Sequence, residues 1–172
     1  MDYLQHSCDF IDIKDIENTE QFSTKGTRSK IILTFDDAFK CHKTIATECL
    51  EPRNIKALFF VPTGFVGLSG NTAFDFARVN FFPKRKPDEL NLNDYDAMTW
   101  DDLDSLIARG HTVGGHTKNH PDLSQAPQRV LEQEIVDSAD ILEDKLQVKI
   151  NHFAYPFGSV ESISKSSFVL AK

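Results

Sequence analysis

Short apolar segments of strand type alternate along this chain with longer segments of helical periodicity, and this alternation limits the folds that it can adopt. Residues 30–35 and 55–61 are apolar and rich in β-branched or aromatic side chains, as strands buried on both faces usually are. Between them, residues 39–53 repeat their apolar side chains at helical spacing, and Pro52 marks the end of that segment. Strands and helices that alternate in this way predict an α/β fold, with helices outside a parallel sheet or barrel.

The second half of the chain continues the alternation. Thr99 can cap a helix with Asp102 at the capping-box position, and Gly110 can end that helix. A weakly specified third strand, a long helix and a fourth strand are expected at residues 112–115, 127–146 and 148–155. The first 29 residues are mostly polar and do not show a further strand clearly.

Residues 63–98 interrupt the pattern with aromatic side chains among polar ones. The aromatic residues are Phe65, Phe74, Phe76, Phe81 and Phe82. A structureless loop of this length is uncommon inside a compact domain, so short helices or a binding lid are expected here. The aromatic rings can stack on a sugar, but such rings mostly pack into cores, and we favour packing.

Composition and charge narrow the classes of partner. A formal net charge of −7 over 172 residues argues against nucleic-acid binding, which needs clustered positive charge. The short basic run at residues 84–86 is interpreted as a solvated loop. No apolar stretch is long enough to span a bilayer, the first twenty residues lack the pattern of a secretory signal, and the three cysteines do not indicate a disulfide framework. We therefore expect one soluble, cytoplasmic domain over residues 1–172, provided that the chain is complete.

Two polar clusters follow expected strands, and parallel α/β folds collect their catalytic residues at such strand ends. Asp36 and Asp37 come directly after residues 30–35. Adjacent carboxylates repel each other unless solvent or a cation neutralises them, although one of them can instead cap the next helix. His116 and His120 are four residues apart and can reach one metal ion from a helical turn or a tight loop. Taken alone, this pair also fits two surface histidines.

A third cluster, Tyr155-Pro156-Phe157-Gly158, ends the fourth expected strand. Its proline and glycine can form a sharp turn that presents a backbone N–H to a ligand. Together, the three clusters predict a hydrolytic metal centre. Two histidines and one carboxylate leave open positions on a metal for water and substrate, and the second carboxylate can act as general base on the metal-bound water. The metal and a backbone N–H would stabilise the oxyanion that forms when water attacks an amide or ester carbonyl.

In combination, three motifs resemble those of the polysaccharide deacetylase family, also called NodB-like or carbohydrate esterase family 4 proteins. The motifs are Thr34-Phe35-Asp36-Asp37, His116-Thr117-Lys118-Asn119-His120 and Tyr155-Pro156-Phe157-Gly158. The resemblance implies a distorted, incomplete (β/α) barrel. It also implies metal-dependent hydrolysis of N-acetyl groups from an N-acetylated saccharide.

The resemblance implies roles for individual residues as well. Asp36 would be the general base, and the backbone N–H of Phe157 would hold the oxyanion. The metal ligands would be Asp37, His116 and His120. The substrate contacts would be Tyr155, Pro156 and Phe157. Thr117 would support the site by hydrogen bonding, whereas His111 resembles a structural position. The metal would be a divalent ion, with Zn²⁺ preferred and Co²⁺, Ni²⁺ or Fe²⁺ as alternatives.

The chain departs from the family pattern at two points. Ala154 stands where the family motif carries an arginine that orients the base. The family takes its general acid from a histidine in a later Leu-x-His motif, and Leu170-Ala171-Lys172 contains none. His152 is a weak candidate for a substitute acid because it precedes the strand end. Two alternatives to an active deacetylase therefore stay open. One is a domain that binds a metal and a saccharide or partner without turnover, and the other is a chain truncated at its C-terminus.

Overall fold

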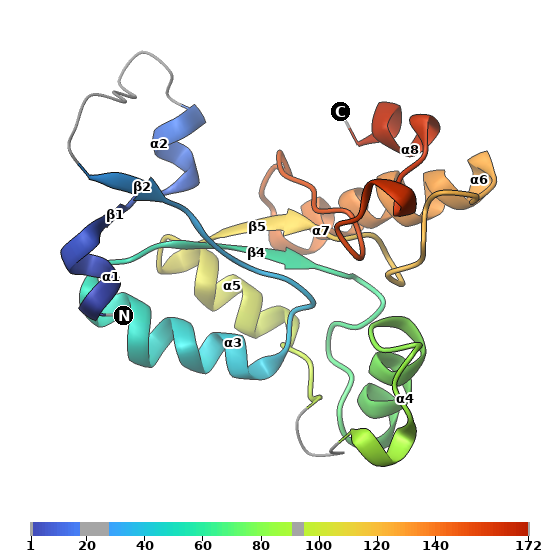
Figure 1. The fold of residues 1–172 in the computed structure, drawn as a ribbon, viewed down its shortest axis with the longest axis horizontal. Coiled ribbons are helices and arrows are strands. Elements are labelled where there is room, and N and C mark those ends of the chain that lie inside the picture. Colours follow the sequence, from blue (N-terminus) through green and yellow to red (C-terminus); the bar gives the residue numbers. More distant parts are fainter. Residues whose placement is uncertain (1, 18–27, 91–94, 172) are drawn as a thin grey trace.

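The computed structural model describes residues 2–17, 28–90 and 95–171, which form an α/β fold with two parallel sheets (Figure 1). In the smaller sheet, β1 (Cys8–Phe10) pairs with β2 (Ser29–Ile31). In the larger sheet, β4 (Ala57–Val61) lies between β3 (Leu33–Phe35) and β5 (Thr112–Gly115). The parallel α/β arrangement expected from the alternating pattern is therefore confirmed. The described strands do not close into a barrel, so the incomplete barrel stays a prediction.

Three details of the expected strands need correction. The strand expected at residues 30–35 is divided at Ile32, so that its two halves join different sheets. The N-terminal region contains β1, which is only three residues long and has too few side chains to show a periodicity. Residues 148–155 do not form a regular strand. Their only described ladder contact is a parallel bridge from Phe153 to Gly115, the last residue of β5.

Most of the expected helices are present. The segment expected at residues 39–53 contains α3 (Lys40–Ile45), a π-helical turn η1 (Ala46–Leu50) and a 3₁₀ turn η2 (Glu51–Arg53). The long helix expected at residues 127–146 is divided into α6 (Gln128–Leu131), the π-helical turn η5 (Glu132–Val136) and α7 (Asp137–Leu146). Shorter elements complete the described chain: α1 (Asp2–Ser7), α2 (Ile13–Glu17), η3 (Pro87–Glu89), η6 (Val160–Ser162) and α8 (Lys165–Leu170).

Helix α5 (Trp100–Ala108) begins as its sequence predicts. Thr99 Oγ1 accepts a hydrogen bond from the Asp102 N–H at 3.2 Å, and Asp102 Oδ2 accepts one from the Thr99 N–H at 3.0 Å. Gly110 follows the helix with a φ of +92°, a conformation that glycine adopts without a steric penalty. An ion pair between Lys43 and Asp102 joins α3 to α5, and the two helices lie side by side in Figure 1.

The interrupted region at residues 63–98 forms a second small core around α4 (Gly70–Asn80). Phe65 is fully buried and Phe81 nearly so, and Phe76 and Phe82 pack against them. The ring of Phe74 packs against Tyr95, which also contacts this core. Both the short helix and the packing role of the aromatic rings are therefore confirmed. None of the described helices is long and apolar enough to cross a membrane.

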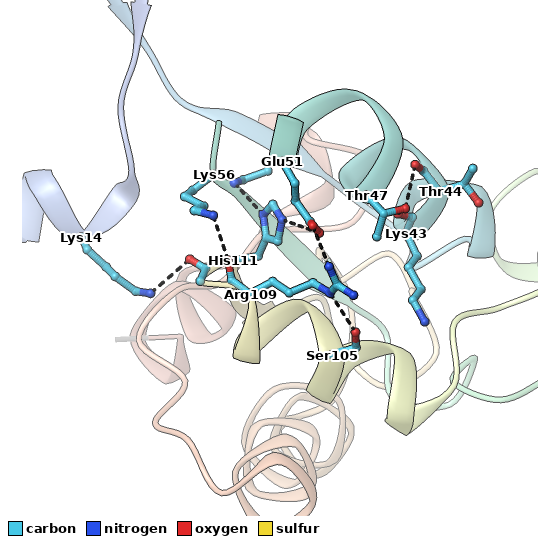
Figure 2. A network of polar contacts seen from close by, with 11 residues as sticks. Lys14, Lys43, Thr44, Thr47, Glu51, Lys56, Ser105, Arg109 and His111 are labelled. Carbon is cyan, nitrogen blue, oxygen red and sulfur yellow. Dashed lines mark hydrogen bonds and ion pairs between the residues drawn. The ribbon is translucent and has the colours of Figure 1, made fainter. Parts of the chain in front are cut away.

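A polar network lies at the end of the sheet where β4 and β5 begin, and Figure 2 shows it from close by. The buried His111 ring accepts a hydrogen bond at Nδ1 from the Ala57 N–H at 3.1 Å, and its Nε2 lies 3.7 Å from Glu51 Oε1. Arg109 donates to the other Glu51 oxygen at 2.9 Å, and Lys56 Nζ donates to the Arg109 carbonyl at 2.8 Å. His111 therefore joins the starts of two strands, which agrees with a structural role.

Candidate metal centre

Three predicted ligands meet at the opposite end of the sheet, where β3 and β5 finish. Asp37 lies two residues after β3, and His116 directly follows β5. The Nε2 atoms of His116 and His120 each lie 3.5 Å from Asp37 Oδ1. One potential ligand atom from each of the three residues lies within 4.8 Å of the other two. The structure thus brings together the residues that the spacing and the resemblance singled out.

Hydrogen bonds orient both imidazole rings toward Asp37. His116 Nδ1 lies 2.8 Å from the Ala154 carbonyl oxygen, and His120 Nδ1 lies 3.1 Å from the Asn80 carbonyl oxygen. A carbonyl oxygen only accepts, so each Nδ1 must carry the hydrogen, and in a neutral ring Nε2 then keeps its lone pair. Burial, together with the neighbouring His116, lowers the pKa of His120, which favours the neutral ring.

The donor set therefore fits a divalent cation. Asp37 Oδ1 is buried and has no hydrogen-bond partner among the described residues. It faces two nitrogen lone pairs, so three electron-rich atoms point at a common space. A buried carboxylate oxygen in such surroundings is costly unless a cation or a proton offsets its charge. Two imidazoles and a carboxylate are the ligands of many catalytic zinc sites.

Both ligand-bearing segments have a strained backbone. Asp37 and Ala38 have φ angles of 71° and 57°, and Thr117 and His120 have φ angles of 64° and 58°. Side chains other than glycine adopt this left-handed region at a cost on the order of 1 kcal/mol or more each. The two histidines are accordingly carried by a tight loop, one of the two arrangements that their spacing allows. The predicted support from Thr117 is present, because its Oγ1 accepts a hydrogen bond from the His120 N–H at 2.9 Å.

Gly64 lies against this loop from the segment that follows β4. Its N–H donates to the Lys118 carbonyl oxygen at 2.8 Å. A Cβ atom at Gly64 would lie 2.6 Å from Asn119 Oδ1 and 2.8 Å from the Lys118 oxygen, both closer than real contacts allow. Only glycine therefore permits this approach of the two backbones.

The ligands open into a cavity of about 310 Å³. Its lining consists of Asp36, Asp37, His116, His120, Tyr155, Phe157 and Gly158. Pro156 is buried in the turn and does not line the cavity. The ring of Phe157 is half-exposed at the rim, and its centroid lies 4.7 Å from that of His120. Burial raises the pKa of Tyr155, and its hydroxyl donates to the Ser167 carbonyl at 3.4 Å.

His152 does not belong to this cavity. Its Nε2 lies 3.0 Å from Glu17 Oε1, and the ring is absent from the cavity lining. Ala154, the residue in place of the expected arginine, contributes through its carbonyl oxygen instead. This carbonyl and that of Asn80 could not be identified from the sequence, because every residue has a backbone acceptor. The structure also identifies Glu134, a buried acid in the long helical segment, as a partner of the histidine loop. Its only sequence signal was an acid next to the apolar stripe of that segment.

Comparison with known proteins identifies the family of this chain. A family model described as polysaccharide deacetylase matches residues 23–168. The structure of the Streptococcus pyogenes deacetylase PplD, solved in complex with acetate, is similar with 21% sequence identity and a TM-score of 0.71. The match covers 98% of this chain and 62% of PplD, so this chain spans less than two thirds of the length of that protein.

Two further structures bear on the comparison. IcaB of Ammonifex degensii has 21% identity and a TM-score of 0.74, over 98% of this chain and 67% of IcaB. A CE4 family pseudoenzyme of Bacillus anthracis has 16% identity and a TM-score of 0.53, over 81% of this chain and 38% of its own. At these identities the solved structures establish a shared fold, whereas the family model establishes the family.

Proposed function

Because the chain belongs to the polysaccharide deacetylase family, we propose that it is a metal-dependent hydrolase that removes N-acetyl groups from a saccharide. One observation carries the proposal. Asp37 Oδ1 has no hydrogen-bond partner among the described residues and faces the Nε2 atoms of His116 and His120. We further propose that the two parallel sheets form part of the incomplete (β/α) barrel of this family, within a single domain.

These three residues would hold the divalent ion. Zn²⁺ is the best match to a set of two imidazoles and one carboxylate, and Co²⁺, Ni²⁺ or Fe²⁺ can use the same ligands. When bound, the ion would supply Lewis acidity for an amide carbonyl and would lower the pKa of water. The chain would bind this ion only with both rings neutral, and their Nδ1 contacts favour the tautomer that leaves each Nε2 free for the ion.

Two further residues of the cavity would act on the reactants. Asp36 lines the cavity beside Asp37, and its carboxylate would take a proton from the attacking water. The backbone N–H of Phe157 would donate a hydrogen bond to the oxygen on which negative charge develops. The exposed ring of Phe157 and the side chain of Tyr155 would contact the sugar at the rim.

A second candidate function, metal and saccharide binding without turnover, is favoured by the cavity lining. The departing amine needs a proton, and a general acid must lie within hydrogen-bond reach of it. With Asp36 as the base and Asp37, His116 and His120 as ligands, Tyr155 is the remaining ionisable group in the described lining. Its hydroxyl donates to the Ser167 carbonyl instead. The pseudoenzyme among the similar structures gives this candidate a precedent in the fold.

One experiment separates the two functions. We would measure bound metal by mass spectrometry and acetate release from N-acetylglucosamine oligomers for the wild type, Asp36→Asn and His116→Ala. If the chain is a deacetylase, the wild type should release acetate, and Asp36→Asn should keep the metal but release acetate at least about 100-fold more slowly. His116→Ala should lose the metal. Bound metal without acetate from any oligomer would favour the second function. A wild type that takes up no divalent metal, even when metal is added, would refute both.

A further inference from the structure

Glu134 is a buried carboxylate outside the cavity, on the π-helical turn η5. The residue is 7% exposed. No ion pair joins it to a basic side chain in the part of the chain that the structure describes. A buried carboxylate normally needs such a partner or several hydrogen bonds. The hydrogen bonds of Glu134 therefore indicate what this residue does.

Every hydrogen bond that its carboxylate makes with a described residue goes to the loop that carries the two histidines. Glu134 Oε2 accepts from the N–H groups of Lys118 and Asn119, at 2.9 and 2.7 Å. Its Oε1 accepts from Asn119 Nδ2 at 2.7 Å. The next N–H, that of His120, donates to Thr117 Oγ1 at 2.9 Å. Side-chain oxygens therefore bind three consecutive N–H groups, the last of which belongs to the ligand His120, and one carboxylate binds two of them in the strong, charge-assisted form.

The same helical segment holds the loop at a second point. Ser138 lies four residues after Glu134, which places the two side chains on one helical face. Its hydroxyl donates to the Thr117 carbonyl at 2.8 Å and lies 2.9 Å from Thr63 Oγ1. Donors and acceptors of the loop are thus both bound from η5 and α7. A strained loop persists only when its surroundings over-determine it.

We infer that Glu134 is a positioning residue for the metal centre, whose carboxylate holds the backbone of residues 118–119 so that His116 and His120 converge on Asp37. The inference rests on the proposed metal-binding role of those three residues. A carboxylate that merely stabilised the fold would leave metal affinity unchanged in the folded protein. A positioning residue changes both the affinity and the geometry of the bound ion, and outer partners of metal ligands typically contribute about 10- to 100-fold in affinity.

The test is a Co²⁺ titration of metal-free protein, followed by the visible absorption spectrum, which reports ligand geometry. We would compare the wild type with Glu134→Ala, Glu134→Gln and the control Glu132→Ala. Glu132 lies on the same turn but is exposed, with a hydrogen bond from Gln128 at 3.1 Å. Thermal unfolding of each metal-free variant would confirm that it is folded.

The two Glu134 variants have different expected results. Glu134→Ala should weaken Co²⁺ binding by about 10- to 100-fold and alter the spectrum. Glu134→Gln should lose less than about 10-fold, because its oxygen can accept both backbone N–H groups while its amide donates to a flipped Asn119 side chain. Glu132→Ala should match the wild type. A folded Glu134→Ala with wild-type affinity and spectrum would overturn the inference.

A variant that fails to fold does not end the test. Glu134→Asp is one methylene shorter and should not reach both N–H groups, so its affinity should fall below that of Glu134→Gln. Equal affinities for the wild type, Glu134→Gln and Glu134→Asp would also overturn the inference. A wild type that binds no Co²⁺ would instead refute the proposed metal centre, and with it the inference.

Discussion

Replacing His111 with leucine tests how the polar network at the start of the sheet contributes to stability. The His111 side chain is fully buried, and its Nδ1 accepts a hydrogen bond from the Ala57 N–H. Ala57 is itself only 5% exposed. Leucine occupies a similar space but leaves this N–H without an acceptor. A buried unsatisfied donor costs about 1–3 kcal/mol, so His111→Leu should lower the free energy of unfolding by that amount at pH 7.5.

The difference should shrink in acid. Burial is the main cause that lowers the pKa of His111, and Lys56 adds to it while Glu51 opposes it. In the unfolded chain His111 binds a proton below a pKa of about 6.5, whereas in the folded protein it binds that proton only at a lower pH. Wild-type stability from this residue is fully present above about pH 6.5 and is lost as the pH falls toward the lower folded-state pKa. His111→Leu has no such loss.

Urea unfolding of the metal-free protein at several pH values measures both effects. Trp100, the one tryptophan of the chain, provides the fluorescence signal because it packs against the main core, which the larger sheet and its helices form around Phe59 and Leu103. Other histidines also titrate, so the quantity of interest is the difference between the variant and the wild type at each pH. A difference that stays constant from pH 7.5 to 5, or a variant as stable as the wild type at pH 7.5, would refute the reasoning.

Three further predictions concern the site and the helices. Asp36→Asn should bind Zn²⁺ with wild-type affinity by calorimetry but release acetate at least about 100-fold more slowly, because a general base accelerates a reaction about 10²–10⁴-fold. Equal rates of acetate release in the variant and the wild type would contradict the role of Asp36 as base. Gly64→Ala should lower the free energy of unfolding, measured in urea, by about 1–3 kcal/mol, because its Cβ would overlap Asn119. An unchanged urea midpoint would show that the loop moves to accept the Cβ without a loss of stability. Thr99→Ala removes one half of the capping box with Asp102 and should cost about 1 kcal/mol in the same assay, whereas Thr99→Ser should cost little.

The ligand set could be predicted from the sequence because residue types that bind metals occur at the ends of expected strands. Asp37 lies two residues after β3 and His116 directly follows β5, and strand ends are where parallel sheets collect functional side chains. Spacing alone left a helical turn or a loop open for His116 and His120, and the loop is specified by contacts from distant residues. Glu134 is the clearest example, because its partners lie 15 and 16 residues away along the chain.

The errors in the expected strands have a related cause. A strand of three residues such as β1 has no periodicity to detect and depends on its distant partner β2. Residues 148–155 have strand-type composition, but they meet β5 only at its last residue, Gly115, so one bridge forms. Local propensity was adequate in that segment, but β5 ends at the residue where the pairing occurs.

The hydrogen bond from His120 to the Asn80 carbonyl has a consequence for the cooperativity of the molecule. Asn80 ends α4, which belongs to the small aromatic core, whereas Asp37 and His116 extend from the strands of the main core. An ion shared by these ligands would therefore tie two separately packed regions into one unit that opens together. Amide hydrogens of α4 should then exchange with deuterium more slowly when Zn²⁺ is added, although no residue of that helix would touch the ion.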